Sequence, residues 1–146
     1  MRLFFGIACA ALALISCSSG YQPPTLDGTS WQLITLESMD DRQGTTTVPD
    51  PGKYTVTFGT DGQAAFQIDC NRGSASWQAK PSATEASGEL TFGPIAVTRM
   101  ACLPPSIDQQ VSTWLTYVRG YLIKNGRLHL SLYADGGILT WEPLHQ

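Results

Sequence analysis

Apolar and polar side chains alternate through much of this chain, most clearly between Tyr54 and Trp77. The apolar residues of the two arms of this stretch fall at every second position: Tyr54, Val56 and Phe58, then Ala64, Phe66, Ile68 and Cys70. A period of two is typical of a strand with one buried face. Asp61-Gly62 between the arms supplies the positive φ that a tight turn needs. We therefore predict a β-hairpin that carries Cys70 and Asn71 to the loop at its end.

The same alternation predicts further strands on both sides of this hairpin. They are expected at 31–36, 74–78, 90–92, 95–97, 121–123, 128–133 and 138–142. Asn125-Gly126, a strong hairpin signal, joins two of them. The polar stretches 37–51 and 80–87 are rich in turn residues, and we expect them to be exposed loops.

One helix is predicted after Pro104-Pro105, because the apolar spacing changes there to 3.6 residues. Its stripe consists of Ile107, Val111, Trp114, Leu115 and Val118. Ser106 is expected to be the N-cap, with Gln109 completing a capping box, and Arg119-Gly120 to end the helix. The stripe is expected to pack on the sheet.

Residues 1–16 have the layout of a signal peptide. Arg2 precedes an uncharged apolar run from Leu3 to Ile15, which is too short for a comfortable membrane span. Leu14-Ile15-Ser16-Cys17 resembles the lipobox of bacterial lipoproteins, in which the chain is cut before the cysteine and the cysteine is acylated. An ordinary signal peptide and an uncleaved anchor are the alternatives. We predict lipidation at Cys17, with residues 17–25 as a short tether.

Two cysteines, Cys70 and Cys102, remain after Cys9 and Cys17 are set aside. In an exported domain such a pair is most simply explained by one disulfide. Free buried thiols and a metal pair are the alternatives, but the sequence lacks CxxC spacing and nearby histidines, so no metal is expected.

The charge of the mature chain is mildly acidic. Removal of residues 1–16 takes away Arg2 and no acid, which changes the formal net charge from −3 to −4. This balance argues against nucleic-acid binding, which requires a basic patch. The remaining length suits a single domain with its own core.

Several short motifs together carry a resemblance to a known family. They are Leu26-Asp27-Gly28-Thr29-Ser30-Trp31-Gln32-Leu33, Cys70-Asn71, the segments 90–95 and 98–102, and Asp135-Gly136-Gly137. Residues 26–143 thereby resemble the META domain family, the group that includes the heat-shock protein HslJ. One departure is Asp69, where glycine commonly precedes the cysteine. The resemblance implies a mainly β fold: a small antiparallel β-barrel of lipocalin-like topology, with about eight strands and one packed α-helix.

Catalytic signals are missing from the sequence. It contains two histidines, His129 and His145, and no G-x-S-x-G, H-E-x-x-H or phosphate-binding motif. Asp69 and Glu89 could form a glycosidase-like carboxylate pair, although nothing in the sequence fixes their separation. We expect no enzymatic activity and no cofactor.

One polar cluster is a candidate recognition surface. The predicted disulfide would draw Arg99 towards Asp69, Asn71 and Arg72. These side chains could stabilise the loop by hydrogen bonds, or they could form a surface that recognises a partner. Both interpretations remain open at this point.

The resemblance and the anchor together predict a non-enzymatic lipoprotein of the bacterial cell envelope, of stress-response or envelope-maintenance type. Ser18, which is not aspartate, favours the outer membrane facing the periplasm, with the inner membrane and the cell surface as alternatives. The expected partners are the membrane, through the lipid anchor, and an unidentified envelope protein.

Two other functions remain open. One is an inhibitor of a protease or lysozyme, with residues 40–51 or 80–87 as the protruding loop. The other is a carrier of a small apolar ligand inside the barrel. The bulky residues expected on the inward faces favour a filled barrel instead: Phe58, Phe66, Phe92 and Trp141.

Overall fold

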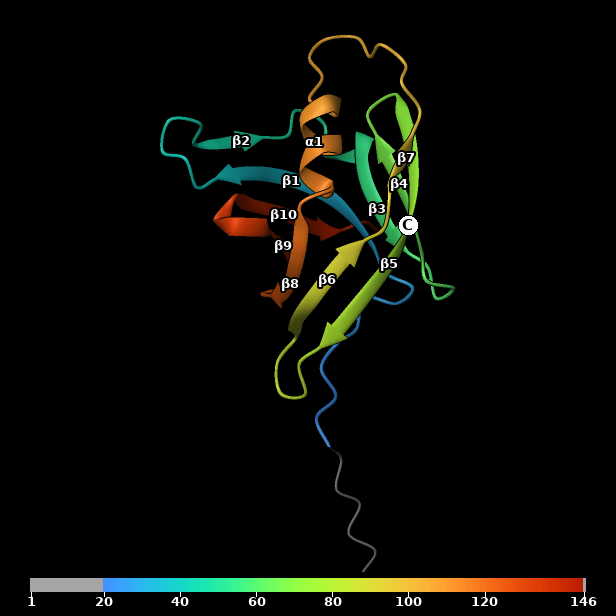
Figure 1. Ribbon diagram of the computed structural model, residues 1–146, viewed down its shortest axis with the longest axis vertical. Helices are drawn as coiled ribbons and strands as arrows, with labels where there is room; N and C mark the ends of the chain where they lie inside the picture. Colours follow the sequence, from blue (N-terminus) through green and yellow to red (C-terminus); the bar gives the residue numbers. More distant parts are fainter. Residues whose placement is uncertain (1–19, 146) are drawn as a thin grey trace, which may run out of the picture.

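The computed structural model describes residues 20–145. The predicted signal peptide at 1–16 and the predicted lipidation site, Cys17, lie outside the described residues. Residues 20–145 form ten strands, one α-helix and two short 3₁₀ helices (Figure 1). They are β1 (Ser30–Ser38), β2 (Thr45–Thr47), η1 (Pro51–Lys53), β3 (Tyr54–Phe58), β4 (Gln63–Ile68), β5 (Asn71–Pro81), β6 (Ser87–Phe92), β7 (Ala96–Val97), α1 (Asp108–Leu115), β8 (Val118–Lys124), β9 (Arg127–Leu132), η2 (Tyr133–Asp135) and β10 (Gly137–Pro143).

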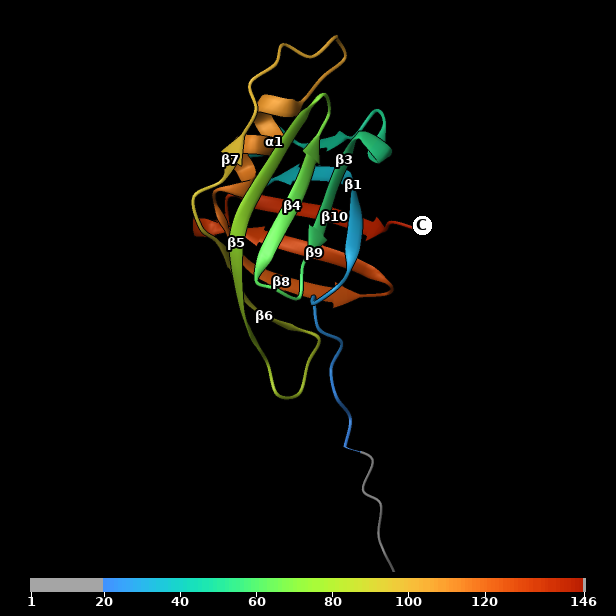
Figure 2. The same ribbon diagram turned by 90° about the vertical axis from the view of Figure 1, so that its right-hand side faces the viewer.

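Eight of these strands close into an antiparallel barrel, which confirms the predicted fold class. Their order is β1-β3-β4-β5-β6-β8-β9-β10, and β10 pairs with β1 again along residues 31–38. Figure 2 shows β3, β4 and β5 crossing in front of β8, β9 and β10. Helix α1 precedes the last three strands, as predicted. The short strands β2 and β7 lie outside the closed circuit, on β1 and β5 respectively.

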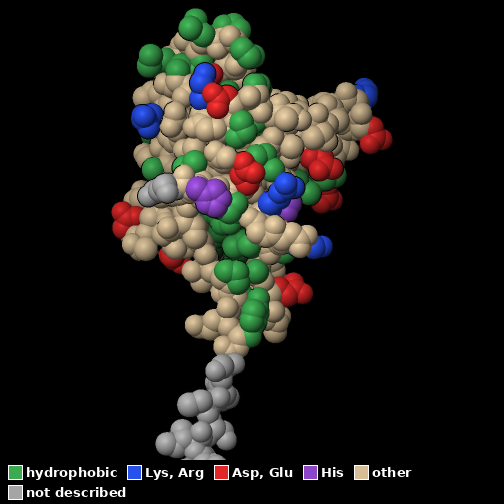
Figure 3. Space-filling model, turned by 180° about the vertical axis from the view of Figure 1, so that it is seen from behind, with side chains coloured by type: hydrophobic (Ala, Val, Ile, Leu, Met, Phe, Trp, Pro, Cys, Tyr) green, Lys and Arg blue, Asp and Glu red, His purple; other side chains and the backbone are tan. Residues whose placement is uncertain are grey.

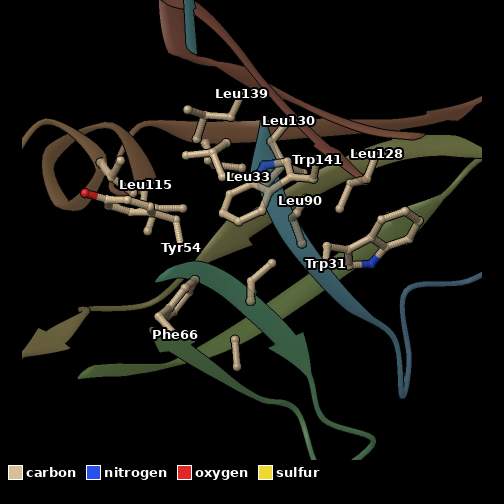
Figure 4. Packing of buried hydrophobic residues seen from close by; sticks show 14 of the residues in the cluster. Trp31, Leu33, Tyr54, Phe66, Leu90, Leu115, Leu128, Leu130, Leu139 and Trp141 are labelled. Carbon is tan, nitrogen blue, oxygen red and sulfur yellow. The ribbon is translucent and has the colours of Figure 1, made fainter. Parts of the chain in front are cut away.

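The interior of the barrel is filled by the alternate residues of its strands. Leu33, Leu90, Leu128, Leu130, Leu139 and Trp141 are all at most 1% exposed, and Figure 4 shows how they pack. The ring of Phe58 lies 5.1 Å from that of Trp77, and Phe66 lies 5.2 Å from Phe92, in edge-to-face pairs. This packing disfavours the hypothesis of an apolar ligand carried inside the barrel.

The predicted hairpins are present, with two changes in the connections. Gly62, Asn125 and Gly126 have the positive φ values expected of their turns, 78°, 53° and 73°. The stretch 37–51 is not entirely a loop, because β2 pairs with β1 there and Val48 is buried. Three consecutive threonines suit a strand because their β-branched side chains favour extended backbone. Strand β5 is also much longer than the predicted 74–78, so the connection to β6 spans only 82–86.

Helix α1 is shorter than predicted and lacks the predicted capping box. It ends at Leu115, and Val118 is buried as the first residue of β8. Ser106 bonds with Asp108 instead of Gln109, accepting from its amide at 3.3 Å and donating to its Oδ1 at 3.0 Å. Gly120 lies within β8, not at a helix end. None of the helices among residues 20–145 is long and apolar enough to span a membrane.

Candidate functional site

The segment between β7 and α1, residues 98–107, projects from the barrel and is called the projecting loop below. It lies at the end of the molecule opposite the described N-terminal residues (Figures 1 and 2). Its tip is apolar: Met100 is 63% exposed and Leu103 is 87% exposed, and Pro104 and Pro105 are also exposed. Hydrophobic side chains accordingly gather at this end of the molecule in Figure 3. Large apolar side chains in such numbers at one tip are unusual for a surface that meets only water.

A disulfide between Cys70 and Cys102 ties the projecting loop to the barrel and confirms the predicted bridge. The two Cα atoms lie 5.5 Å apart. Cys70 is not on the inward face of the hairpin, as the alternation suggested, but is exposed in the turn between β4 and β5. The alternation ends at Ile68 because the chain turns at Asp69, which has a φ of 55°. The bridge therefore fixes the loop from outside the core.

The side chain of Asn71, at the start of β5, holds the projecting loop from inside. It is only 3% exposed. Its Oδ1 accepts hydrogen bonds from the Met100 amide at 2.7 Å and from the Thr98 hydroxyl at 3.0 Å. Its Nδ2 donates to the Met100 carbonyl at 3.1 Å and to Oδ2 of Asp108 at 3.2 Å. One buried amide thus uses its donors and its acceptor to join β5, the loop and the start of α1.

Both ends of the projecting loop have further anchors. At its start, the Thr98 amide donates to the Arg72 carbonyl at 3.0 Å, and the Arg72 amide donates to the Thr98 hydroxyl at 3.0 Å. At its end, the Ile107 amide donates to the hydroxyl of Tyr54 at 3.0 Å. Tyr54 is buried in the barrel, so the loop is connected to the core. These contacts hold the backbone in place while the apolar tip stays exposed.

The four residues of the predicted recognition corner divide into two pairs. Asn71 is buried, and the side chain of Asp69 is 8% exposed, with its Oδ1 3.9 Å from Nζ of Lys53. Asp69 has a positive φ, a conformation that glycine adopts easily and aspartate tolerates. This explains why glycine is common at this position in the META domain family. Arg72 and Arg99 are exposed, and neither has a carboxylate within 4.0 Å among residues 20–145. Only this second pair is available to a partner.

The proposed glycosidase-like pair is not formed. Asp69 stands beside Lys53, whereas Glu89 lies 3.2 Å from Lys80. Lys80 and the start of β5 are nine residues apart along one strand, which corresponds to roughly 30 Å. Asp69 and Glu89 are therefore too far apart to act on one glycosidic bond.

His129 has a structural contact. It is half-buried on β9, and its Nδ1 lies 3.1 Å from the hydroxyl of Thr140. Burial, with the nearby positive charges of Arg127 and Lys124, lowers the pKa of His129 below its ordinary value. The ring is thus held neutral near pH 7 and bonded to a neighbouring strand.

Two surface grooves flank α1. One, of about 690 Å³, lies between the helix and residues 95–101, beside the base of the projecting loop. The other, of about 610 Å³, is lined by exposed apolar side chains that include Met39, Tyr117 and Tyr133. Both volumes are in the range of sites that bind small molecules or peptide segments.

Sequence reasoning did not single out the apolar tip of the projecting loop. The signal was present in Met100-Ala101-Cys102-Leu103-Pro104-Pro105, an apolar run that fits neither a strand nor a helix period. The two prolines at its end argue against a buried strand, because proline cannot donate a hydrogen bond to a neighbouring strand. Such a run next to a disulfide cysteine is therefore a candidate for exposure.

These features define a class of protein: a small closed β-barrel that presents a disulfide-tied apolar loop. A family model described as the META domain matches residues 24–143, and the chain belongs to that family. The comparison with curated proteins finds no match for this chain.

Solved structures of two bacterial proteins show the same fold. An NMR structure of a protein from Burkholderia xenovorans is 25% identical, with a TM-score of 0.65, and the match covers 99% of this chain and 100% of that one. A DUF4847 family protein from Bacteroides vulgatus is 14% identical, with a TM-score of 0.54, and the match covers 82% of this chain and 94% of that one. The second likeness concerns the fold alone.

Proposed function

We propose that this protein is a non-enzymatic binding module of the bacterial envelope that captures a partner protein through the projecting loop. The observation that carries the proposal is an exposed apolar tip on a backbone fixed by a disulfide and by Asn71. A loop that is already ordered loses little conformational freedom on binding, so more of the contact energy remains as affinity.

The tip also has the apolar character of an interface centre. Leu103 and Met100 can each enter an apolar pocket on a partner, and the adjacent prolines keep the backbone stiff. Arg72 and Arg99 stand near the base of the loop, and among the described residues neither has a carboxylate within 4.0 Å. An apolar centre with a charged margin is the usual arrangement of a protein–protein contact.

The position of the loop fits a tethered protein. Residues 20–25 leave the barrel at the end opposite the projecting loop (Figures 1 and 2). If Cys17 carries a lipid, as we propose, the tip faces away from the membrane and towards proteins of the same compartment. We propose the outer membrane facing the periplasm as that location, and stress response or envelope maintenance as the role.

An enzyme inhibitor of protease or lysozyme type is the second candidate function. The projecting loop favours it more than the segments 40–51 and 80–87 do, because a stiff apolar loop can enter an active-site cleft. The two candidates differ in the partner, which is an envelope component in the first and a hydrolase in the second.

Site-specific photocrosslinking tests the proposal. A photoreactive amino acid replaces Leu103 at the tip, and in a matched control it replaces Thr84, an exposed residue of the 82–86 connection at the other end of the barrel. After irradiation of intact cells, we expect one defined protein adduct from position 103 and none from position 84. Loss of the adduct in a protein that also carries Met100→Asp would support recognition by the tip. Adducts of equal yield at both positions, or none at either, would contradict it.

A further inference from the structure

The groove between α1 and residues 95–101 has the layout of a peptide-binding cleft. One wall is the short strand β7 and the loop that follows it, and the other is a helix face. Its volume of about 690 Å³ is sufficient for several residues of an extended chain. Figures 1 and 2 both show β7 beside α1.

Strand β7 offers a free backbone edge to this groove. It pairs with β5 alone among the described strands, with Ala96 opposite Ser74 and Val97 opposite Gly73. The Thr98 amide bonds to β5, and bonded residues alternate along an antiparallel pair. The amide and carbonyl of Val97 therefore point away from β5, to the side where a further strand would pair.

The helix wall of the groove carries one long side chain, Gln109, and otherwise short ones. Ser112 donates its hydroxyl to the Asp108 carbonyl at 2.7 Å, and Thr116 donates its hydroxyl to the Thr113 carbonyl at 2.7 Å. Both hydroxyls are thus turned back onto the helix. The exposed Gln109 is the one long side chain on this wall that an incoming chain would have to displace.

The charged residues at the groove indicate whether an acidic or a basic segment would bind there. Arg99 lines it and has no carboxylate within 4.0 Å in the part of the chain that the structure describes. Asp108, the carboxylate at the same wall, already accepts hydrogen bonds from Asn71 and Ser106. Asp108 keeps its charge but is half-buried, whereas Arg99 is exposed, so the charge that an incoming chain meets first is positive. An acidic segment therefore complements the groove better than a basic one.

We propose that this groove binds an extended acidic segment of a partner protein as an additional antiparallel or parallel strand on β7. Main-chain hydrogen bonds to Val97 give the affinity, and Arg99 gives the preference for acidic side chains. The inference rests on the proposed function, because it supplies a second contact for the same partner beside the projecting loop. The described N-terminal segment of this chain, residues 20–25, leaves from the opposite end of the barrel and does not reach the groove.

The probe is a fluorescent, end-capped peptide of sequence Glu-Val-Thr-Val-Thr-Val-Glu. Controls are the same peptide with alternate backbone amides N-methylated, and a version with Lys in place of Glu. We expect saturable binding of the first peptide with a Kd below about 1 mM, and at least roughly tenfold weaker binding of both controls. In ¹⁵N-labelled protein, the Val97 amide should shift and exchange more slowly with the peptide bound.

Three variants locate the binding. Val97→Pro removes the outward amide without touching a bond to β5, and Thr116→Trp fills the groove from the exposed residue that follows α1. Each should weaken binding at least tenfold. Arg99→Glu should do the same, whereas Arg127→Glu, with the same change of charge at a distant exposed site, should not. Thermal unfolding checks that each variant is folded. If Val97→Pro does not fold, Thr116→Trp still tests whether the peptide binds in the groove.

The outcomes separate this inference from the proposed function. Binding without a change at the Val97 amide, equal binding of the N-methylated peptide, or no binding at 1 mM would each overturn strand addition. A crosslink from position 103 together with any of these results would leave the projecting loop as the recognition element without the groove.

Discussion

The substitution Asn71→Asp is a sharp test of how the projecting loop is held. The side chain keeps its shape, but the atom that donates to the Met100 carbonyl and to Asp108 becomes an acceptor. The contacts with the Met100 carbonyl and with Asp108 become repulsive. The hydrogen bonds that Oδ1 accepts from the Met100 amide and the Thr98 hydroxyl can persist. The substitution therefore isolates the donors of one buried amide.

The size of the effect follows from the geometry. A buried polar group that loses its partner costs about 1–3 kcal/mol. Two carboxylates about 4 Å apart repel by about 4 kcal/mol at an effective dielectric constant of 20, and Nδ2 of Asn71 lies 3.2 Å from Oδ2 of Asp108. We expect the free energy of unfolding at pH 7 to fall by at least about 3 kcal/mol, a large share of the 5–15 kcal/mol typical of a domain.

The effect should depend on pH in a defined direction. Burial and the charge of Asp108 raise the pKa of the introduced carboxyl in the folded state above its unfolded value of about 3.9. The folded state then binds more protons than the unfolded state above that pH, so stability falls as pH rises. The difference between Asn71→Asp and the wild type should be smallest near pH 4, where a protonated carboxyl can donate again, and largest at pH 7.

Urea unfolding of the oxidised protein, followed by tryptophan fluorescence, measures this difference. The matched control is Asn125→Asp, the same chemical change in an exposed turn where aspartate also tolerates the positive φ. It should change stability by less than about 0.5 kcal/mol. If Asn71→Asp behaved like this control at pH 7, the assigned role of the buried amide would be wrong.

Three more predictions concern the disulfide, the histidine and a glycine. Replacing both Cys70 and Cys102 by alanine should lower stability by about 3–4 kcal/mol, as expected for a loop closed over a separation of 32 residues, and calorimetry with and without reductant checks it. Because the pKa of His129 in the folded state lies below its ordinary 6.5, the wild-type protein should lose stability as pH falls through that value. The His129→Gln variant should lose less stability than the wild type between pH 7.5 and 5. Equal curves of stability against pH for the two proteins would refute this. Gly137→Ala should destabilise by more than about 2 kcal/mol, because φ is 153° and a Cβ would lie 2.5 Å from the Glu37 carbonyl oxygen; Gly44→Ala, which meets nothing within 4 Å, should cost clearly less.

Local patterns were sufficient to predict most of the strands and hairpins, and the resemblance to the META domain family supplied their closure into a barrel. Asp61-Gly62 and Asn125-Gly126 define their turns because few other residues adopt a positive φ cheaply. The end of α1 was predicted wrongly because Val118 continues the helical stripe in the sequence, although it is buried as part of β8. An apolar residue at position 118 would be buried either as a further residue of the helix or as the first residue of the strand, so its burial does not distinguish α1 from β8.

The candidate site depended on contacts that a sequence does not contain. Nothing in the sequence tells that Asn71 is buried or that its amide meets Met100, because these residues come together only through the pairing of β5 with β7 and the disulfide. The alternative of loop-stabilising hydrogen bonds therefore describes Asn71, whereas the side chain of Asp69 is paired with Lys53. The alternative of a recognition surface is left to Arg72, Arg99 and the apolar tip.

Amide hydrogen exchange at Met100 tests most directly whether the projecting loop is held rigid. The side chain of Met100 is 63% exposed, yet its amide donates to the buried Oδ1 of Asn71 at 2.7 Å. We predict that this amide exchanges much more slowly than that of Leu103 at the tip of the same loop, and that Asn71→Ala removes the difference. Fast exchange of the Met100 amide in the wild-type protein, at the rate of Leu103, would contradict the account.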